Sequence, residues 1–300
     1  MMNWTRCTLT LICCYVTLIA SGGELSKIRG DLHSQSGSSS NSSSSSSSNP
    51  PSKSDLGQPS RSDSGHTSRH CDDDDGDSLT SRLAALGLMG FGAAVTSPFW
   101  APYLMLGDDL DRDGYFPKHP YENIDGTLTL DETVRGTHDT AITLQGVLGT
   151  DFGDMQLING RALIEHRSRF GIDTEFKYRR ENLAGGSHDH LWNGDANLTF
   201  RFAQHEHWLI RAGLGVNWLD NRGDTEAGFN LTYGVDWYPV DPLIVSGVID
   251  WGRISAASLF HGRATIGFIR EGWGAFTGYD YFRVSDSDAH SWIAGIERRF

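Results

Sequence analysis

The sequence predicts an all-β fold for its C-terminal half: an antiparallel up-and-down transmembrane β-barrel of about ten strands, within a range of about 8–12. Three observations lead to this prediction. Apolar residues recur at every second position over much of residues 140–300, charged residues fill many alternate positions, and aromatic residues stand near the ends of the apolar rows. Side chains alternate between the two faces of a strand, so a period of two gives each strand one apolar and one polar face.

The N-terminal third differs in composition from the rest. Residues 1–22 are predicted to be a cleaved signal peptide, because Arg6 precedes an apolar stretch, Cys7–Ile19, that is too short to cross a bilayer as a helix. Residues 23–77 are rich in Ser and are predicted to be a disordered linker in the periplasm, since they offer little apolar surface to bury. The formal net charge of −13 argues against nucleic-acid binding, which requires clustered Lys and Arg.

Residues 78–135 are predicted to form a short helix and an irregular connector. Leu83–Val95 is apolar nearly all round, and Pro98 and Pro102 should prevent the helix from continuing. This helix could pack at the barrel mouth, lie at the membrane interface, or span an inner membrane.

The connector contains an acidic motif. Asp109, Asp111 and Asp113, followed by Gly114, match the first half of an EF-hand loop, so calcium is the one possible cofactor. Pro120 stands where that loop requires a bidentate Glu, and a solvated acidic turn is the alternative.

Residues 136–300 are predicted to form the barrel, and the segment from Trp208 to Trp218 shows the pattern most clearly. Trp208, Ile210, Ala212, Leu214, Val216 and Trp218 share one face. At about 3.3 Å per residue and a tilt near 40°, this face covers about 25 Å, the height of the apolar band of an outer-membrane barrel.

The links between the predicted strands alternate in length. Short links such as Ser168–Arg169 and Arg270–Glu271 alternate with longer polar ones such as Asp151–Asp154, Glu181–His190 and Ser285–His290. Short turns at one end and longer loops at the other are typical of membrane barrels, and an even number of strands returns both barrel ends to the periplasmic side.

The two faces of the strands predict two sets of residues. A narrow barrel has little interior room, so opposite charges in the lumen should pair, since an unpaired buried charge is costly. The predicted lumen charges are Arg161, Glu165, Asp173, Glu175, Lys177, Arg179, Asp195, Arg201, Arg211, Asp236, Asp250, Arg263, Asp280, Glu297 and Arg299. The predicted aromatic girdle is Trp192, Trp208, Trp218, Trp237, Trp273, Tyr279, Tyr281, Trp292 and Phe300.

The last strand carries a resemblance to a known class. Trp292, Ala294, Ile296 and Phe300 share one face and close on a C-terminal Phe, whereas Arg298 departs from the pattern. This arrangement resembles the assembly signal of outer-membrane β-barrel proteins of Gram-negative-type bacteria. The resemblance implies a location in the cell outer membrane, with lipid and the outer-membrane assembly machinery as partners.

For function, the sequence favours a non-enzymatic barrel with a structural or interaction role and a salt-bridged lumen. A narrow channel for ions or small solutes is the first alternative. The second is a rim-located lipid or peptide hydrolase, for which His188 and His190 flank Asp189 in a predicted outer loop. No catalytic residues are assigned, and the sequence identifies no periplasmic or envelope partner.

Overall fold

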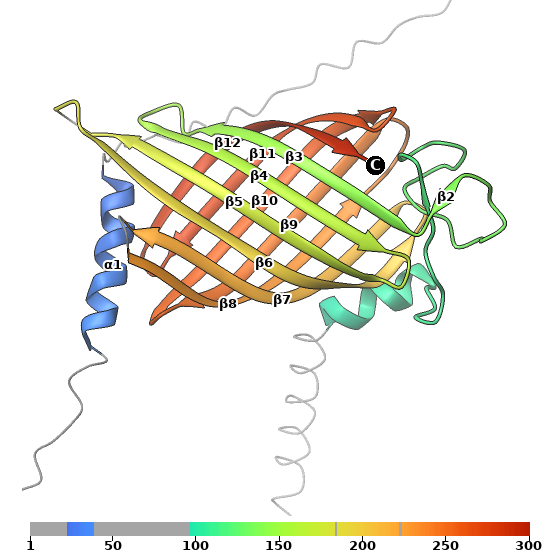
Figure 1. Ribbon diagram of the computed structural model, residues 1–300, viewed down its shortest axis with the longest axis horizontal. Helices are drawn as coiled ribbons and strands as arrows, with labels where there is room; N and C mark the ends of the chain where they lie inside the picture. The colour runs from blue at the N-terminus through green and yellow to red at the C-terminus, as the bar shows by residue number, and fades with distance from the viewer. Residues whose placement is uncertain (1–22, 39–96, 184, 222–223) are drawn as a thin grey trace, which may run out of the picture.

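The computed structural model describes residues 23–38, 97–183, 185–221 and 224–300. Ten antiparallel strands close into an up-and-down barrel, in which the last strand pairs with the first (Figure 1). The predicted ten-strand barrel is therefore confirmed. Its strands are β3 (Thr140–Thr150), β4 (Met155–His166), β5 (Phe170–Asn182), β6 (His188–His205), β7 (Trp208–Asn221), β8 (Asp224–Trp237), β9 (Leu243–Ile254), β10 (Ala257–Arg270), β11 (Trp273–Val284) and β12 (Ser287–Arg299).

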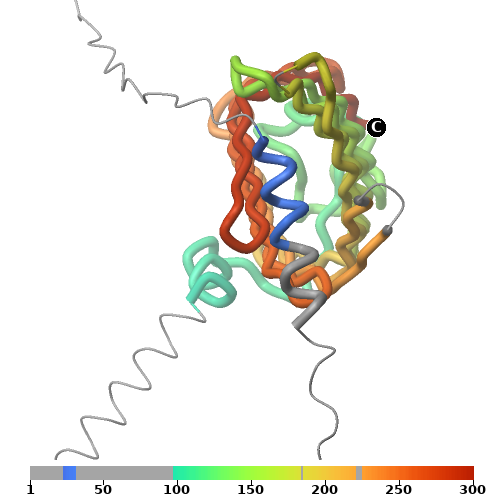
Figure 2. Tube along the Cα trace, turned by 90° about the vertical axis from the view of Figure 1, so that its left-hand side faces the viewer, coloured from blue at the N-terminus to red at the C-terminus, as the bar shows by residue number. Residues whose placement is uncertain are grey.

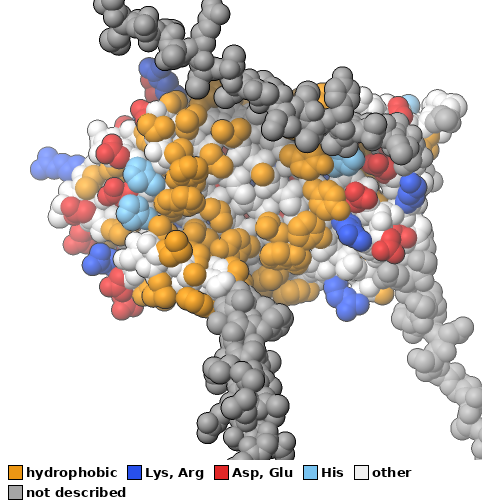
Figure 3. Space-filling model, turned by 180° about the vertical axis from the view of Figure 1, so that it is seen from behind, with side chains coloured by type: hydrophobic (Ala, Val, Ile, Leu, Met, Phe, Trp, Pro, Cys, Tyr) orange, Lys and Arg blue, Asp and Glu red, His pale blue; other side chains and the backbone are white. Residues whose placement is uncertain are grey.

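The barrel has its apolar side chains outside and its charged side chains inside. In β5, Asp173, Glu175 and Lys177 are buried, whereas Ile172 and Phe176 are 52% and 47% exposed. Figure 3 shows apolar side chains spread over the middle of one outer face, with charged side chains gathered toward both ends. A water-soluble barrel would show the opposite distribution, because its apolar face would be buried.

The predicted difference in link length is wrong. At the loop end, defined by links 151–154, 183–187, 222–223, 255–256 and 285–286, three links are as short as links 206–207 and 271–272 at the opposite, turn end. The strands simply run further than the apolar pattern does. Asn182 and His188, for example, are polar residues that still pair in register at the loop end.

A helix, α1 (Glu24–Ser38), lies across the loop end of the barrel (Figure 2). Its Leu25 and Ile28 are fully buried in an apolar cluster with strand residues such as Leu191 and Phe282. The prediction that residues 23–77 form a disordered periplasmic linker is therefore wrong for α1, while residues 39–77 lie outside the described ranges. With two buried apolar side chains, α1 carries too weak a sequence pattern to be recognised without the surface on which it docks.

A second helix covers residues 97–106, so the prediction that Pro98 and Pro102 end the helical segment is wrong. Pro102 has no N–H to offer the carbonyl oxygen of Pro98, and that oxygen accepts a 2.9 Å hydrogen bond from the Tyr233 hydroxyl instead. Phe99 contacts Phe202 and Tyr233 on the outer surface near the turn end. Leu83–Val95 lies outside the described ranges. No helix in the described ranges combines the length and apolar character that crossing a bilayer requires.

Residues 107–139 close the turn end, opposite α1 (Figure 1). Apart from β1 (Phe116–Pro117) and β2 (Thr137–His138), which pair with each other, the segment is irregular. Phe116 and Leu128 form a buried apolar cluster with Leu209 of the barrel wall. Beside this cluster, Gly126 packs so closely against the backbone of Glu206 that an added Cβ would clash with its carbonyl oxygen, and the next amide, of Thr127, donates a 2.9 Å hydrogen bond to that oxygen.

Candidate functional site

The lumen holds charged side chains from around the wall. All fifteen residues predicted for the lumen lie on the inward face: fourteen are buried, and the side chain of Arg299 is 11% exposed. The structure adds His261, a buried residue on the inward face of β10. The sequence analysis did not include His261 in the lumen set, because a formally neutral residue gives no signal of belonging to a charge network.

Ion pairs cross the lumen between opposite walls. The barrel order places β5 half-way round the ring from β10. Arg263 of β10 contacts Glu175 of β5 at 2.5 Å, and Arg179 of β5 contacts Asp280 of β11 at 3.1 Å. Asp280 also binds Arg263 at 3.0 Å and His261 at 2.8 Å. The network therefore ties the two walls together and occupies the middle of the lumen.

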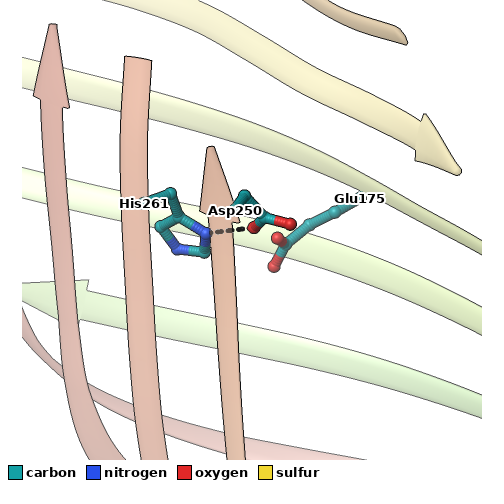
Figure 4. Close-up of side chains that lie close together, drawn as sticks. All are labelled: Glu175, Asp250 and His261. Atoms are coloured by element: carbon teal, nitrogen blue, oxygen red, sulfur yellow. Dashed lines mark hydrogen bonds and ion pairs between the residues drawn. The ribbon is translucent and has the colours of Figure 1, made fainter. Parts of the chain in front are cut away.

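One part of this network has the composition of a metal site. Glu175, Asp250 and His261 offer ligand atoms within 4.8 Å of one another (Figure 4). However, the ammonium of Lys177 lies 2.6 Å from Glu175 and 3.2 Å from the Nε2 of His261, and Arg263 lies 2.5 Å from Glu175. Asp250 accepts a 2.7 Å hydrogen bond from the His261 ring. Two cations thus satisfy Glu175, and we interpret the cluster as part of the ion-pair network.

Other pairs run along the wall. Burial of a charge is costly unless it is paired and hydrogen-bonded, so these contacts stabilise the filled lumen. Asp195 has no ion pair within the described ranges and instead accepts a 2.7 Å hydrogen bond from Asn197. The wall pairs are Arg161 with Asp173 (2.5 Å), Arg211 with Asp236 (2.7 Å) and Arg201 with Glu165 (3.1 Å).

The turn end is fixed by a buried arginine that the sequence analysis missed. Arg169 binds Asp108 through both terminal nitrogens, at 2.7 and 2.8 Å, and donates a 2.6 Å bond to the carbonyl oxygen of Asp109. The same Asp108 carboxylate accepts a 3.0 Å hydrogen bond from the backbone N–H of Gln204. Residues 107–139 are therefore tied to the barrel at two places, the link between β4 and β5 and the end of β6.

Tyr121 makes a further contact at the turn end. Its hydroxyl donates a 2.6 Å hydrogen bond to the carbonyl oxygen of Leu243. Burial, and to a smaller extent the nearby carboxylate of Asp241, raises the pKa of Tyr121 to about 12. The hydroxyl therefore keeps its proton, and with it this contact, at neutral pH.

The loop end is closed by polar contacts to α1. The carboxylate of Glu181 accepts hydrogen bonds from the amides of residues 23–25, at 2.6, 2.9 and 3.0 Å. Arg29 binds Asp189 through two bonds of 2.7 Å. A carboxylate at a helix N-terminus accepts hydrogen bonds from backbone amides that have no partner within the helix. Its negative charge also interacts favourably with the positive end of the helix dipole. The barrel thus supplies the N-terminal cap that α1 itself lacks.

Glu181→Ala should weaken the docking of α1. We expect the loss of a buried, charge-assisted cap to cost about 1–2 kcal/mol, which increases the undocked population about 5–30-fold. Hydrogen–deuterium exchange of the α1 amides measures this change. Glu132→Ala, at an exposed position in residues 107–139, is the control. Equal exchange rates in both variants would contradict the capping role.

The predicted girdle residues lie on the outward face at both ends of the barrel. Trp208 and Trp237 stack with their rings 5.1 Å apart and 13° from parallel. Trp251, which is 44% exposed, joins this outward set, although the sequence analysis did not include it. Trp192, Trp218, Tyr279, Tyr281 and Trp292 lie toward the loop end, and Trp208, Trp237, Trp273 and Phe300 lie toward the turn end.

The three acidic residues predicted to bind calcium are not brought together. Asp109 lies 3.9 Å from Arg112, Asp113 lies 3.6 Å from Arg167, and Asp111 is exposed. They are not among the carboxylate and imidazole groups of the described ranges that are close enough to share a metal ion.

The histidines of the proposed hydrolase rim do not form a catalytic set with Asp189. His188 and His190 occupy exposed positions of β6, rather than the predicted loop, whereas Asp189 between them is buried and binds Arg29. Successive residues of a strand point to opposite faces, which separates these groups.

No model of a protein family matches the chain, and a search of curated proteins finds no match. Solved structures of bacterial outer-membrane barrels do match. The Yersinia pestis outer membrane protein Ail is 15% identical, with 54% of this chain and 98% of Ail covered and a TM-score of 0.29. An outer membrane channel from Pseudomonas putida F1 is 12% identical, with 54% and 94% covered and a TM-score of 0.31. The translocator domain of the Neisseria meningitidis autotransporter NalP is 12% identical, with 74% and 98% covered and a TM-score of 0.25. Similarity at this level says nothing about function.

Proposed function

We propose that this chain is an outer-membrane β-barrel protein, exported through a cleaved signal peptide, with a non-enzymatic structural or interaction role. The outward surface supports the membrane location. Leu198, Leu214 and Phe229 are each at least 56% exposed near the middle of their strands, and aromatic residues flank this band at both ends. Lipid is the solvent that suits such a surface.

A closed lumen supports the structural role. Ion pairs between Glu175 and Arg263, and between Arg179 and Asp280, cross the interior, α1 covers the loop end, and residues 107–139 cover the turn end. The observation that carries the proposal is the first of these, because side chains that bind each other across the lumen obstruct the passage of solutes along the barrel axis.

The last strand supports the proposed partners, outer-membrane lipid and the assembly machinery. Phe300 is 54% exposed on the outer surface. Arg298, which departs from the expected apolar pattern, places its guanidinium 4.9 Å from the ring centroid of Trp273 and 5.2 Å from that of Phe300. An arginine over aromatic rings suits the level of lipid headgroups.

The membrane assignment is tested by gel migration of the protein after extraction in detergent. A membrane barrel stays folded in cold detergent, so we expect the unheated protein to migrate differently from the boiled protein. A band that does not shift would contradict the assignment.

We expect no steady conductance from the wild-type barrel in planar lipid bilayers, because the lumen is crossed by ion pairs and covered at both ends. As a control, protein from vesicles made with the same preparation is run on a gel with and without heating. A heat-dependent shift of its band shows that folded barrel is present. Reproducible single-channel currents would contradict the closed lumen and favour the narrow-channel alternative.

A further inference from the structure

A hollow opens on the outer surface of the barrel near the loop end, across β9, β10 and β11. It has a volume of about 740 Å³. Its base is a row of three rings: Phe260 lies 6.0 Å from Trp251 on one side and 6.0 Å from Tyr281 on the other. Ser258, which shares the outward face of β10 with Phe260, is small and leaves the space beside these rings open.

Two arginines stand at the edge of the hollow that faces the loops. Arg253 follows Trp251 by two positions on β9, and Arg283 follows Tyr281 by two positions on β11, so each arginine shares the outward face with a ring. At about 3.3 Å per residue, the arginines lie about 7 Å further toward the loops. Aromatic rings mark the membrane interface of such barrels. The offset of about 7 Å from these rings therefore places the guanidinium groups at the level of lipid headgroups.

The contacts of these arginines leave hydrogen-bond donors available. Arg253 donates one 3.3 Å bond, to the carbonyl oxygen of Ala256. Arg283 donates a 2.8 Å bond to the carbonyl oxygen of Ser285 and lies 3.8 Å from Asp286, whose side chain is 98% exposed. These bonds hold both guanidinium groups beside the hollow. A guanidinium has five N–H donors, so each group can still bind two oxygens of a phosphate.

We propose that this hollow binds a phosphate-bearing anionic lipid of the membrane leaflet at the loop end. Arg253 and Arg283 bind the phosphate oxygens, and the apolar part of the lipid lies on Trp251, Phe260 and Tyr281. The two guanidinium groups outnumber the single carboxylate of Asp286, so the hollow favours an anion. Rings directly below the anion site favour a lipid over a free phosphate ion. The proposal rests on the membrane location argued above.

The test measures retention of phosphatidylglycerol by the detergent-purified protein with native mass spectrometry, against phosphatidylcholine as the neutral comparison. We expect the wild type to prefer phosphatidylglycerol. The double variant R253Q/R283Q should lose that preference by about tenfold, because charge-assisted bonds to phosphate are removed.

The matched control is R180Q/R270Q, which removes the same formal charge from outward positions of β5 and β10 that do not line the hollow. This control should retain the preference. An equal loss in both double variants would show diffuse charge attraction only and would overturn the proposal.

Two further outcomes would also overturn it. One is equal retention of both lipids by the wild type, and the other is displacement of phosphatidylglycerol by inorganic phosphate at similar concentration, which would make the hollow a phosphate site. The heat-dependent gel shift is recorded on every sample. A shifted band without lipid preference removes this inference alone, whereas a missing shift in the wild type removes the membrane barrel itself.

Discussion

Asp280→Asn is expected to destabilise the barrel by about 3–5 kcal/mol, the cost of removing one partner from a buried ion pair. Asp280 binds His261, Arg263 and Arg179. His261 keeps its hydrogen bond to Asp250, and Arg263 keeps its contact with Glu175. Arg179 keeps its hydrogen bond to Asn193 and its contact with the ring of Phe282, but both are neutral, so within the described ranges it loses its ion-pair partner. Unfolding by denaturant in lipid vesicles, followed by tryptophan fluorescence, measures the change.

Two variants separate this effect from a general effect of losing a carboxylate. Asp286→Asn changes a side chain that is 98% exposed and should alter the stability by no more than about 0.5 kcal/mol. Adding Arg179→Met to Asp280→Asn should restore much of the lost stability, because the uncompensated cation is then gone. If the double variant is less stable than Asp280→Asn alone, the cross-lumen pair does not work as described.

Leu214→Arg is expected to cost about 2–4 kcal/mol, the penalty for an arginine on the lipid face near the bilayer midplane. Leu214 is 56% exposed in the middle of β7. In water, an arginine at so exposed a position would cost almost nothing. The free energy of unfolding in lipid vesicles therefore reports which solvent covers the strand.

Val240→Arg is the matched control for this substitution. Val240 is 58% exposed, nearly the same as Leu214, but it lies in the link between β8 and β9 at the turn end. The penalty for arginine falls to about 0–1 kcal/mol near the membrane interface. Equal penalties at the two positions would mean that lipid does not cover the middle of the barrel.

The alternation of residues predicts the strands well, because each strand reports its own two faces. Trp208 to Trp218 in β7 shows the pattern without reference to any other segment. The alternation also predicts that Glu175 and Arg263 face the same lumen, but not that they bind each other. That contact depends on the number of strands and on their stagger, which bring β5 opposite β10.

The two caps could not be predicted for a different reason. α1 contributes Leu25 and Ile28, and it becomes a helix with a satisfied N-terminus only when Glu181 is beside it. Arg169 and Asp108 lie in separate segments that each look like polar surface. Sequence patterns report local preference, whereas these elements are fixed by distant partners. The ends of the strands were missed for the same reason. The polar residues there form backbone pairs between strands, although neither face of the strand is apolar at that point.

The position of α1 sets the order in which the molecule can be completed. Its partners Glu181, Asp189 and Ser287 are separated from it by more than 150 residues, and Ser287 belongs to the last hairpin. Contacts between residues so distant along the chain must wait for the intervening chain to be arranged. The first described helix can therefore reach its final place only after the last strand has been added, and a docked α1 distinguishes a finished barrel from an incomplete one.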